Sequence, residues 1–125
     1  GRAFCTKYAM RRSRSIDLLQ DILDFIDRIE AWSPNAAVRD SDVDEKTLYA
    51  VLHALQHIGE AISRLPKDVT DLAPEIPWAR IRAMRNLIAH DYAGVDATIV
   101  WKTVRERLPE LRISVMSMID RLGQD

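Results

Sequence analysis

The chain has 125 residues, a length typical of a single domain with one hydrophobic core. Hydrophobic residues make up 47% of it and charged residues 30%, which excludes a disordered chain, and no apolar run is long enough to span a membrane. The formal net charge of -1 excludes a protein that coats nucleic acid through bulk positive charge, so RNA binding would have to depend on a local patch. The single cysteine, Cys5, excludes an internal disulfide framework and favours the reducing cytoplasm.

The first nine residues show neither helical periodicity nor the apolar centre of a secretory signal. The chain begins with glycine, and Met10 is a candidate native start. We therefore expect residues 1–13 to be a tag or a disordered amino terminus, and residues 14–125 to form one helical domain.

Apolar residues recur at helical spacing in four segments, and nothing in the chain has the signals of a strand hairpin. The segments run from about Ser15 to Trp32, from about Asp42 to Leu65, from Trp78 to about Tyr92, and from just after Asp96 to about Leu122. KDVTDL at 67–72 could form one short turn, and Pro109 is expected to kink the last helix or divide it. The pattern predicts an all-α fold, an up-and-down bundle of four to five helices.

The helix predicted from Trp78 carries polar groups opposite its apolar side, namely Arg82, Arg85, Asn86 and His90. Three arginines and no acidic residue lie between Trp78 and His90 in a slightly acidic chain, which predicts an anion site. Arginine matches phosphate oxygens with a planar fork of donors, and histidine can take or give a proton near neutral pH. Arg85 and His90 lie about 140° apart around the helix, so two copies related by a twofold axis would be needed to grip one phosphate.

A competing set of residues lies on the second predicted helix. His53, His57 and Glu60 share one face at helical spacing, and such a set can bind a metal ion. The set lacks the HExxH pattern and obvious further ligands, so we expect no metal site and interpret the histidines as polar or interface residues. Glu60 is expected to line the same cleft as Arg85.

RNLIAH at 85–90 resembles the RxxxxH motif of HEPN domains, and RNLIAHDY resembles the RxxxxHxY signature of the HepT-like toxin branch. IGEA at 58–61, RLP at 64–66, PEIPW at 74–78 and LPELR at 108–112 also look typical of that branch. The resemblance extends from about Ile16 to Leu122. It implies a HEPN-like, homodimeric bundle with a metal-independent ribonuclease site and no cofactor.

Carried over to this chain, the resemblance implies that His90 acts as acid or base, that Arg85 stabilises the transition state, and that Asn86 orients the phosphate. Arg82 and Glu60 are the candidate substrate-binding residues. The implied partners are RNA and a minimal nucleotidyltransferase antitoxin, similar to MntA, that adds AMP to Tyr92; no membrane is implied. The alternative is a non-catalytic module that binds a nucleotide or serves as the docking partner of the nucleotidyltransferase.

Lys102, Arg105 and Arg112 could extend a path for RNA, although acidic neighbours make a salt-bridged surface an equal alternative. Three tryptophans are interpreted as core or interface residues rather than as base-stacking platforms: Trp32, Trp78 and Trp101.

Overall fold

The computed structural model describes residues 2–32, 45–90 and 96–124, and at residues 2–6, 8, 87, 89 and 90 the description covers the backbone alone. Five helices lie in these ranges, and no strand does. They are α1 (Arg2–Trp32), α2 (Glu45–Ser63), the single turn α3 (Lys67–Thr70), α4 (Trp78–His90) and α5 (Ala97–Gly123). The all-α prediction of four main helices with one short additional turn is confirmed.

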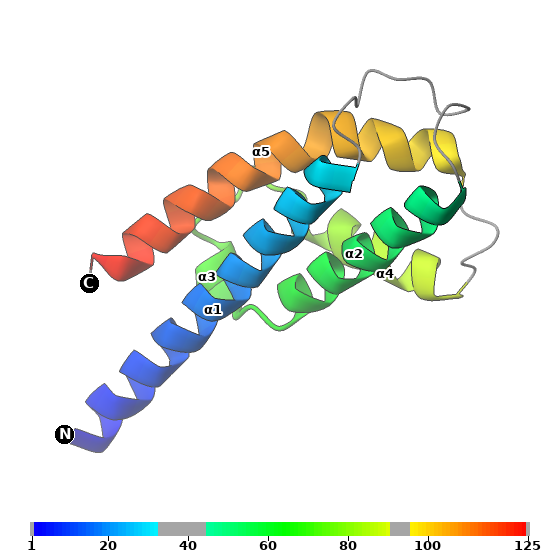
Figure 1. Ribbon diagram of the computed structural model, residues 1–125. Helices are drawn as coiled ribbons and strands as arrows, with labels where there is room; N and C mark the ends of the chain where they lie inside the picture. Colours follow the sequence, from blue (N-terminus) through cyan, green and yellow to red (C-terminus); the bar gives the residue numbers. More distant parts are fainter. Residues whose placement is uncertain (1, 33–44, 91–95, 125) are drawn as a thin grey trace.

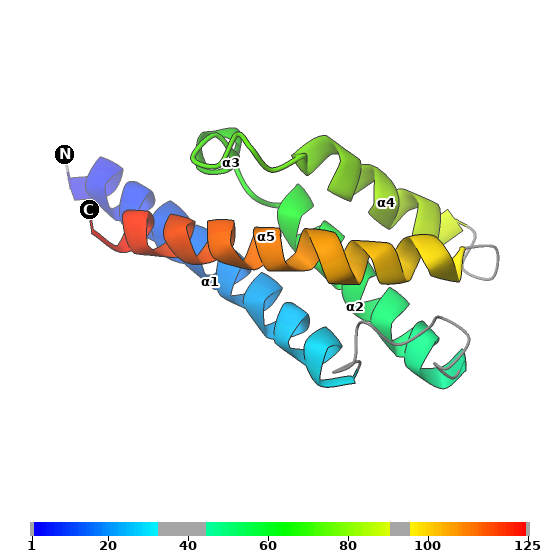
Figure 2. The same cartoon turned by 90° about the horizontal axis from the view of Figure 1, so that it is seen from above.

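Helix α2 packs against α1 on one side and α4 on the other, and α1 also packs against α5 (Figure 1). Successive long helices run in opposite directions, and both termini lie at the same end of the bundle (Figure 2). Four isoleucine and leucine residues of α1 are fully buried at spacings of three and four, and they form one wall of the core: Leu19, Ile22, Ile26 and Ile29.

Local signals explain where the helices begin and end. The carboxylate of Asp96 accepts a hydrogen bond of 2.9 Å from the backbone N–H of Thr98, so Asp96 caps α5, which begins just after it as predicted. Pro109 lies inside α5, which continues past it as one helix and is not divided. The buried indole of Trp78 donates to the carbonyl oxygens of Thr70 and Ala73, 3.0 Å from each, and so ties the start of α4 to the proline-rich connection.

The first helix begins at Arg2, well before the start expected near Ser15. Residues 2–13, expected to be a tag or disordered, continue α1 as helix; the division of the chain at residue 14 itself stays a prediction. The described side chains from Lys7 to Arg14 are exposed or half-buried, whereas Ser15 is buried. This part of α1 therefore makes little contact with the core, so the amphipathic pattern that would announce a helix is missing there.

None of the helices that the structure describes is both long enough and apolar enough to cross a membrane.

Candidate active site

Arg85 lies on the side of α4 that faces α2, and its side chain packs against α2 at Gly59. A Cβ atom added to Gly59 would stand 2.6 Å from Cβ and 3.1 Å from Cγ of Arg85, both well inside van der Waals contact. Glycine is thus the residue that lets the stem of Arg85 lie directly on the α2 backbone. This close approach explains why the IGEA segment at 58–61 has a glycine at its second position.

The Arg85 guanidinium is held by neutral oxygen atoms. Its Nη2 and Nε donate to Oδ1 of Asn86 at 3.1 and 3.3 Å, and its Nη1 donates to the hydroxyl of Ser63 at 3.4 Å. The Ser63 hydroxyl donates in turn to the carbonyl oxygen of Glu60 at 2.7 Å, which leaves its lone pairs free to accept from Arg85. Among the residues that the structure describes, no carboxylate forms an ion pair with Arg85, and these neutral partners orient the guanidinium without neutralising it.

Ser63 is a site residue that the sequence reasoning did not include. It follows Gly59 by one helical turn and therefore lies on the same face of α2, and this spacing was the available signal. Glu60 joins the network only through its carbonyl oxygen. Its carboxylate lies 3.3 Å from Nη2 of Arg64 and does not contact Arg85.

The other predicted site residues are described to different extents. Arg82 is half-buried one turn before Arg85, and the Asn86 side chain is exposed beside it. His90 is the last residue of α4, where the description covers its backbone alone. Tyr92 lies outside the described residues. The proposed roles of all these residues stay predictions.

The competing histidines lie away from Gly59 on α2: around the helix, His57 is about 200° and His53 about 240° from it. Nε2 of His53 is 3.0 Å from Nε2 of His57, and Phe25 of α1 stacks on the His57 ring. The Glu60 carboxylate is occupied by Arg64. Within the described ranges, no group of three or more ligating side chains could hold a metal ion.

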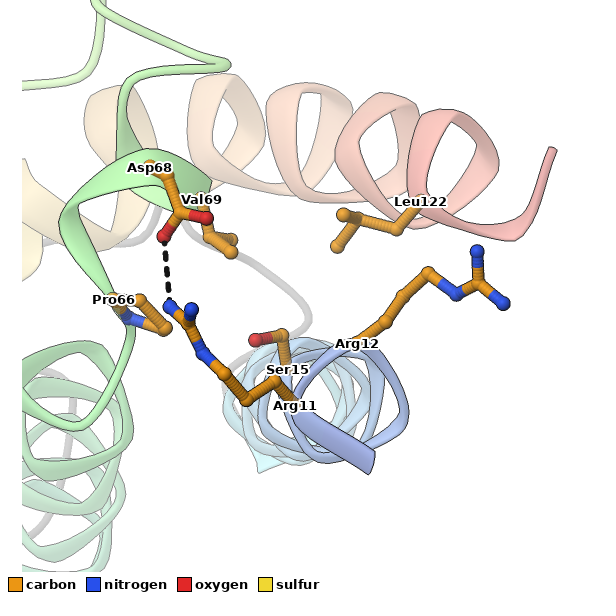
Figure 3. Close-up of a pocket in the computed structure, with 7 residues that line it drawn as sticks. All are labelled: Arg11, Arg12, Ser15, Pro66, Asp68, Val69 and Leu122. Carbon is orange, nitrogen blue, oxygen red and sulfur yellow. Dashed lines mark hydrogen bonds and ion pairs between the residues drawn. The ribbon is translucent and has the colours of Figure 1, made fainter. Parts of the chain in front are cut away.

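Two hollows in the surface lie apart from Arg85. Figure 3 shows a hollow of about 40 Å³ between α1, α3 and Leu122 of α5, in which Arg11 reaches across to Asp68 at 3.3 Å. That volume has room for little more than water. A hollow of about 160 Å³ lies between α4 and α5, on a floor of Ile76, Ile81 and Met84.

Arg112, a candidate for an RNA path, instead joins α5 to α1. Its guanidinium lies 2.6 Å from the carboxylate of Asp27 and 2.8 Å from that of Glu30. Partial burial lowers the pKa of Arg112, but hydrogen bonds and attraction from the two carboxylates outweigh it, so the pKa lies above its ordinary value. This residue therefore belongs to a salt-bridged surface, as the second interpretation had it, although with partners on α1.

Comparisons with known proteins agree with the family resemblance of the sequence. The chain is 43% identical over 103 residues to "Probable ribonuclease HepT" of Thermococcus cleftensis, covering 82% of this chain and 93% of that protein. It is 35% identical over 108 residues to a protein of Methanocaldococcus jannaschii named provisionally as an RNase, covering 86% of this chain and 89% of that protein. A protein of Caldanaerobacter subterraneus with the same provisional description is 31% identical over 104 residues, covering 83% and 89%. No solved structure matches the chain significantly. The family model described as "Ribonuclease HepT-like" matches residues 22–118, and the chain belongs to the HepT-like family.

Proposed function

We propose that this protein is a metal-independent endoribonuclease of a toxin–antitoxin pair, with an active site formed by Arg85, Asn86 and His90. The observation that carries the proposal is the charged guanidinium of Arg85, held in place by the neutral oxygens of Asn86 and Ser63. Membership of the HepT-like family, whose relatives carry ribonuclease names, supports the choice of RNA as substrate. Together they favour cleavage over a purely structural role for α4.

The reaction needs no metal ion. The ribose 2'-hydroxyl oxygen attacks the adjacent phosphorus atom, and the bond from phosphorus to the 5' oxygen of the next nucleotide breaks. His90 takes the proton of the attacking hydroxyl, or gives a proton to the leaving oxygen, while Arg85 stabilises the negative charge that builds on the phosphoryl oxygens. The products are a 2',3'-cyclic phosphate and a 5'-hydroxyl end.

The site is composite and requires a homodimer. About 140° of helix separates Arg85 from His90, so one α4 presents the two side chains in different directions. When two copies meet around a twofold axis, two arginines and two histidines line one cleft. Arg82, one turn before Arg85, adds positive charge for the RNA backbone, and Glu60 contributes through the carbonyl oxygen that holds Ser63.

Regulation by a partner acts at Tyr92. A minimal nucleotidyltransferase antitoxin transfers AMP from ATP to Tyr92, two residues after His90: the phenol oxygen loses its proton and attacks the α-phosphorus, and pyrophosphate leaves. The added phosphate brings negative charge and bulk to the place where the RNA phosphate binds, so electrostatic repulsion and occlusion both inhibit cleavage. Tyr92→Phe is expected to cleave RNA and to resist neutralisation when the nucleotidyltransferase and ATP are added.

The test is cleavage of labelled RNA by the purified dimer in excess EDTA, with Arg85→Ala and His90→Ala variants whose helicity matches the wild type. We expect cyclic-phosphate ends from the wild type and none from either variant. Cleavage only after a divalent ion is added would contradict metal independence and redirect attention to His53 and His57. Absence of cleavage under both conditions would favour the non-catalytic binding or docking module.

A further inference from the structure

An exposed pair of histidines occupies the side of α2 that faces α1. His53 and His57 are one helical turn apart, and their Nε2 atoms approach to 3.0 Å. The phenyl ring of Phe25 stacks on the His57 imidazole with centroids 5.0 Å apart and planes 3° apart. Packing between helices therefore fixes the ring of His57, while both imidazoles remain open to solvent.

The separation of the two nitrogen atoms fits two neighbouring ligands of one metal ion. Imidazole nitrogens bind divalent transition metals at about 2.1 Å, so two of them at a right angle lie about 3.0 Å apart, whereas a tetrahedral angle would place them about 3.4 Å apart. The observed 3.0 Å matches the right angle of tetragonal or octahedral coordination. In the absence of an ion, the same distance suits a hydrogen bond from one neutral imidazole to the other, which keeps the pair together.

In place of the expectation from the sequence that no metal site lies here, we propose that His53 and His57 form a two-ligand site for a divalent transition metal ion, with Cu²⁺ bound more tightly than Ni²⁺ and Ni²⁺ more tightly than Zn²⁺. Right-angled coordination by nitrogen is typical of Cu²⁺ and Ni²⁺, and the affinities of nitrogen sites rise towards Cu²⁺. Water molecules complete the coordination sphere, which the exposure of both side chains permits.

The surroundings limit the affinity of this site. Glu60 adds no third ligand because its carboxylate pairs with Arg64 at 3.3 Å. The guanidinium of Arg28 lies 5.1 Å from the centre of the Phe25 ring, so a positive charge stands near the site and weakens the binding of another cation. We therefore expect micromolar rather than nanomolar affinity, and reversible binding.

The inference does not depend on the ribonuclease proposal, since the described hydrogen-bond partners of Arg85 are Asn86 and Ser63 and neither histidine is among them. An ion bound at two positions one turn apart holds that turn in its helical form. Because the ion binds the folded chain preferentially, it should raise the melting temperature by several degrees at saturating concentration.

The test is isothermal titration of the untagged full chain with CuCl₂ and with NiCl₂, followed by thermal melting in each ion. We expect one ion per chain, at least tenfold weaker binding in His53→Ala and in His57→Ala, and loss of the thermal shift in both variants. Electron paramagnetic resonance of the Cu²⁺ complex should show two coupled nitrogens. His90→Ala and Glu60→Gln serve as matched controls that keep full binding. The assignment would be overturned if a variant carrying both His53→Ala and His57→Ala still bound one ion per chain, or if the wild type bound no ion at millimolar concentration.

Discussion

Replacing Gly59 by alanine tests whether the close approach of α4 to α2 positions Arg85. The new methyl group would stand 2.6 Å from Cβ of Arg85. That carbon is fixed to the α4 backbone and cannot swing aside as the end of a flexible side chain could. The two helices must therefore separate locally, or the arginine stem must be displaced.

The expected effect on stability is small, but that on activity is large. Carbon atoms in contact lie about 3.5–4.0 Å apart, so relief requires a displacement of about 1 Å. Overpacking of this kind costs about 1–3 kcal/mol, and replacing glycine by alanine within a helix returns about 0.5–1 kcal/mol. We expect a net loss of about 1 kcal/mol in the free energy of unfolding. Displacing a catalytic group by about 1 Å should lower the cleavage rate by about 100-fold.

The assay combines urea unfolding with single-turnover cleavage of labelled RNA. Gly123→Ala is the matched control, because its added Cβ would have no atom within 4 Å, and it should leave both quantities unchanged. The stability loss of Gly59→Ala should shrink when Arg85→Gly removes the opposing Cβ, which a double-mutant cycle measures. If Gly59→Ala cleaves RNA at the wild-type rate, the proposed positioning of Arg85 is incorrect.

Three further substitutions probe separate contacts. Ser63→Ala should slow single-turnover cleavage about fivefold through loss of the hydroxyl beside Arg85, whereas Ser63→Thr, which keeps a hydroxyl, should cleave at the wild-type rate. If Ser63→Ala also cleaves at the wild-type rate, the 3.4 Å contact does not contribute to catalysis. Trp78→Phe removes a donor to two carbonyl oxygens and should lower the free energy of unfolding by about 1–3 kcal/mol, so an unchanged urea midpoint would contradict the role given to the indole. Arg112→Met should cost about 1 kcal/mol at low salt and less in 1 M NaCl, and a loss that ignores salt would point to packing instead of ion pairing.

The long helices were predictable because their periodicity, caps and prolines agree. Asp96 caps α5, Pro66 follows α2, and α4 begins at Trp78 directly after a proline. The start of α1 could not be read in this way, because the described side chains from Lys7 to Arg14 are exposed or half-buried and the sequence there carries no apolar stripe. Continuation of the helix there requires only that nothing stops it, and the segment before Ser15 contains no proline or glycine after residue 1.

The site was only partly predictable for a related reason. The residue types on α4 indicated an anion site, since three arginines and no acidic residue lie between Trp78 and His90. The sequence did not indicate which side of α2 would meet that helix. Gly59 and Ser63 gain their meaning from this tertiary contact, because one permits the approach and the other supplies an acceptor at its end.

The chemistry of the acceptors around Arg85 bears on why a slightly acidic chain can present an anion site at all. A carboxylate in the place of Ser63 would hold the guanidinium more firmly, but it would also cancel the positive charge that attracts the substrate phosphate. The hydroxyl of Ser63 and the amide of Asn86 orient the same group and leave its charge intact. The carboxylate of Glu60, the nearest acidic residue along that stretch of α2, is meanwhile paired with Arg64. Among the described residues, the neutral partners of Arg85 therefore preserve its positive charge, and Arg82 one turn earlier adds to the local positive potential.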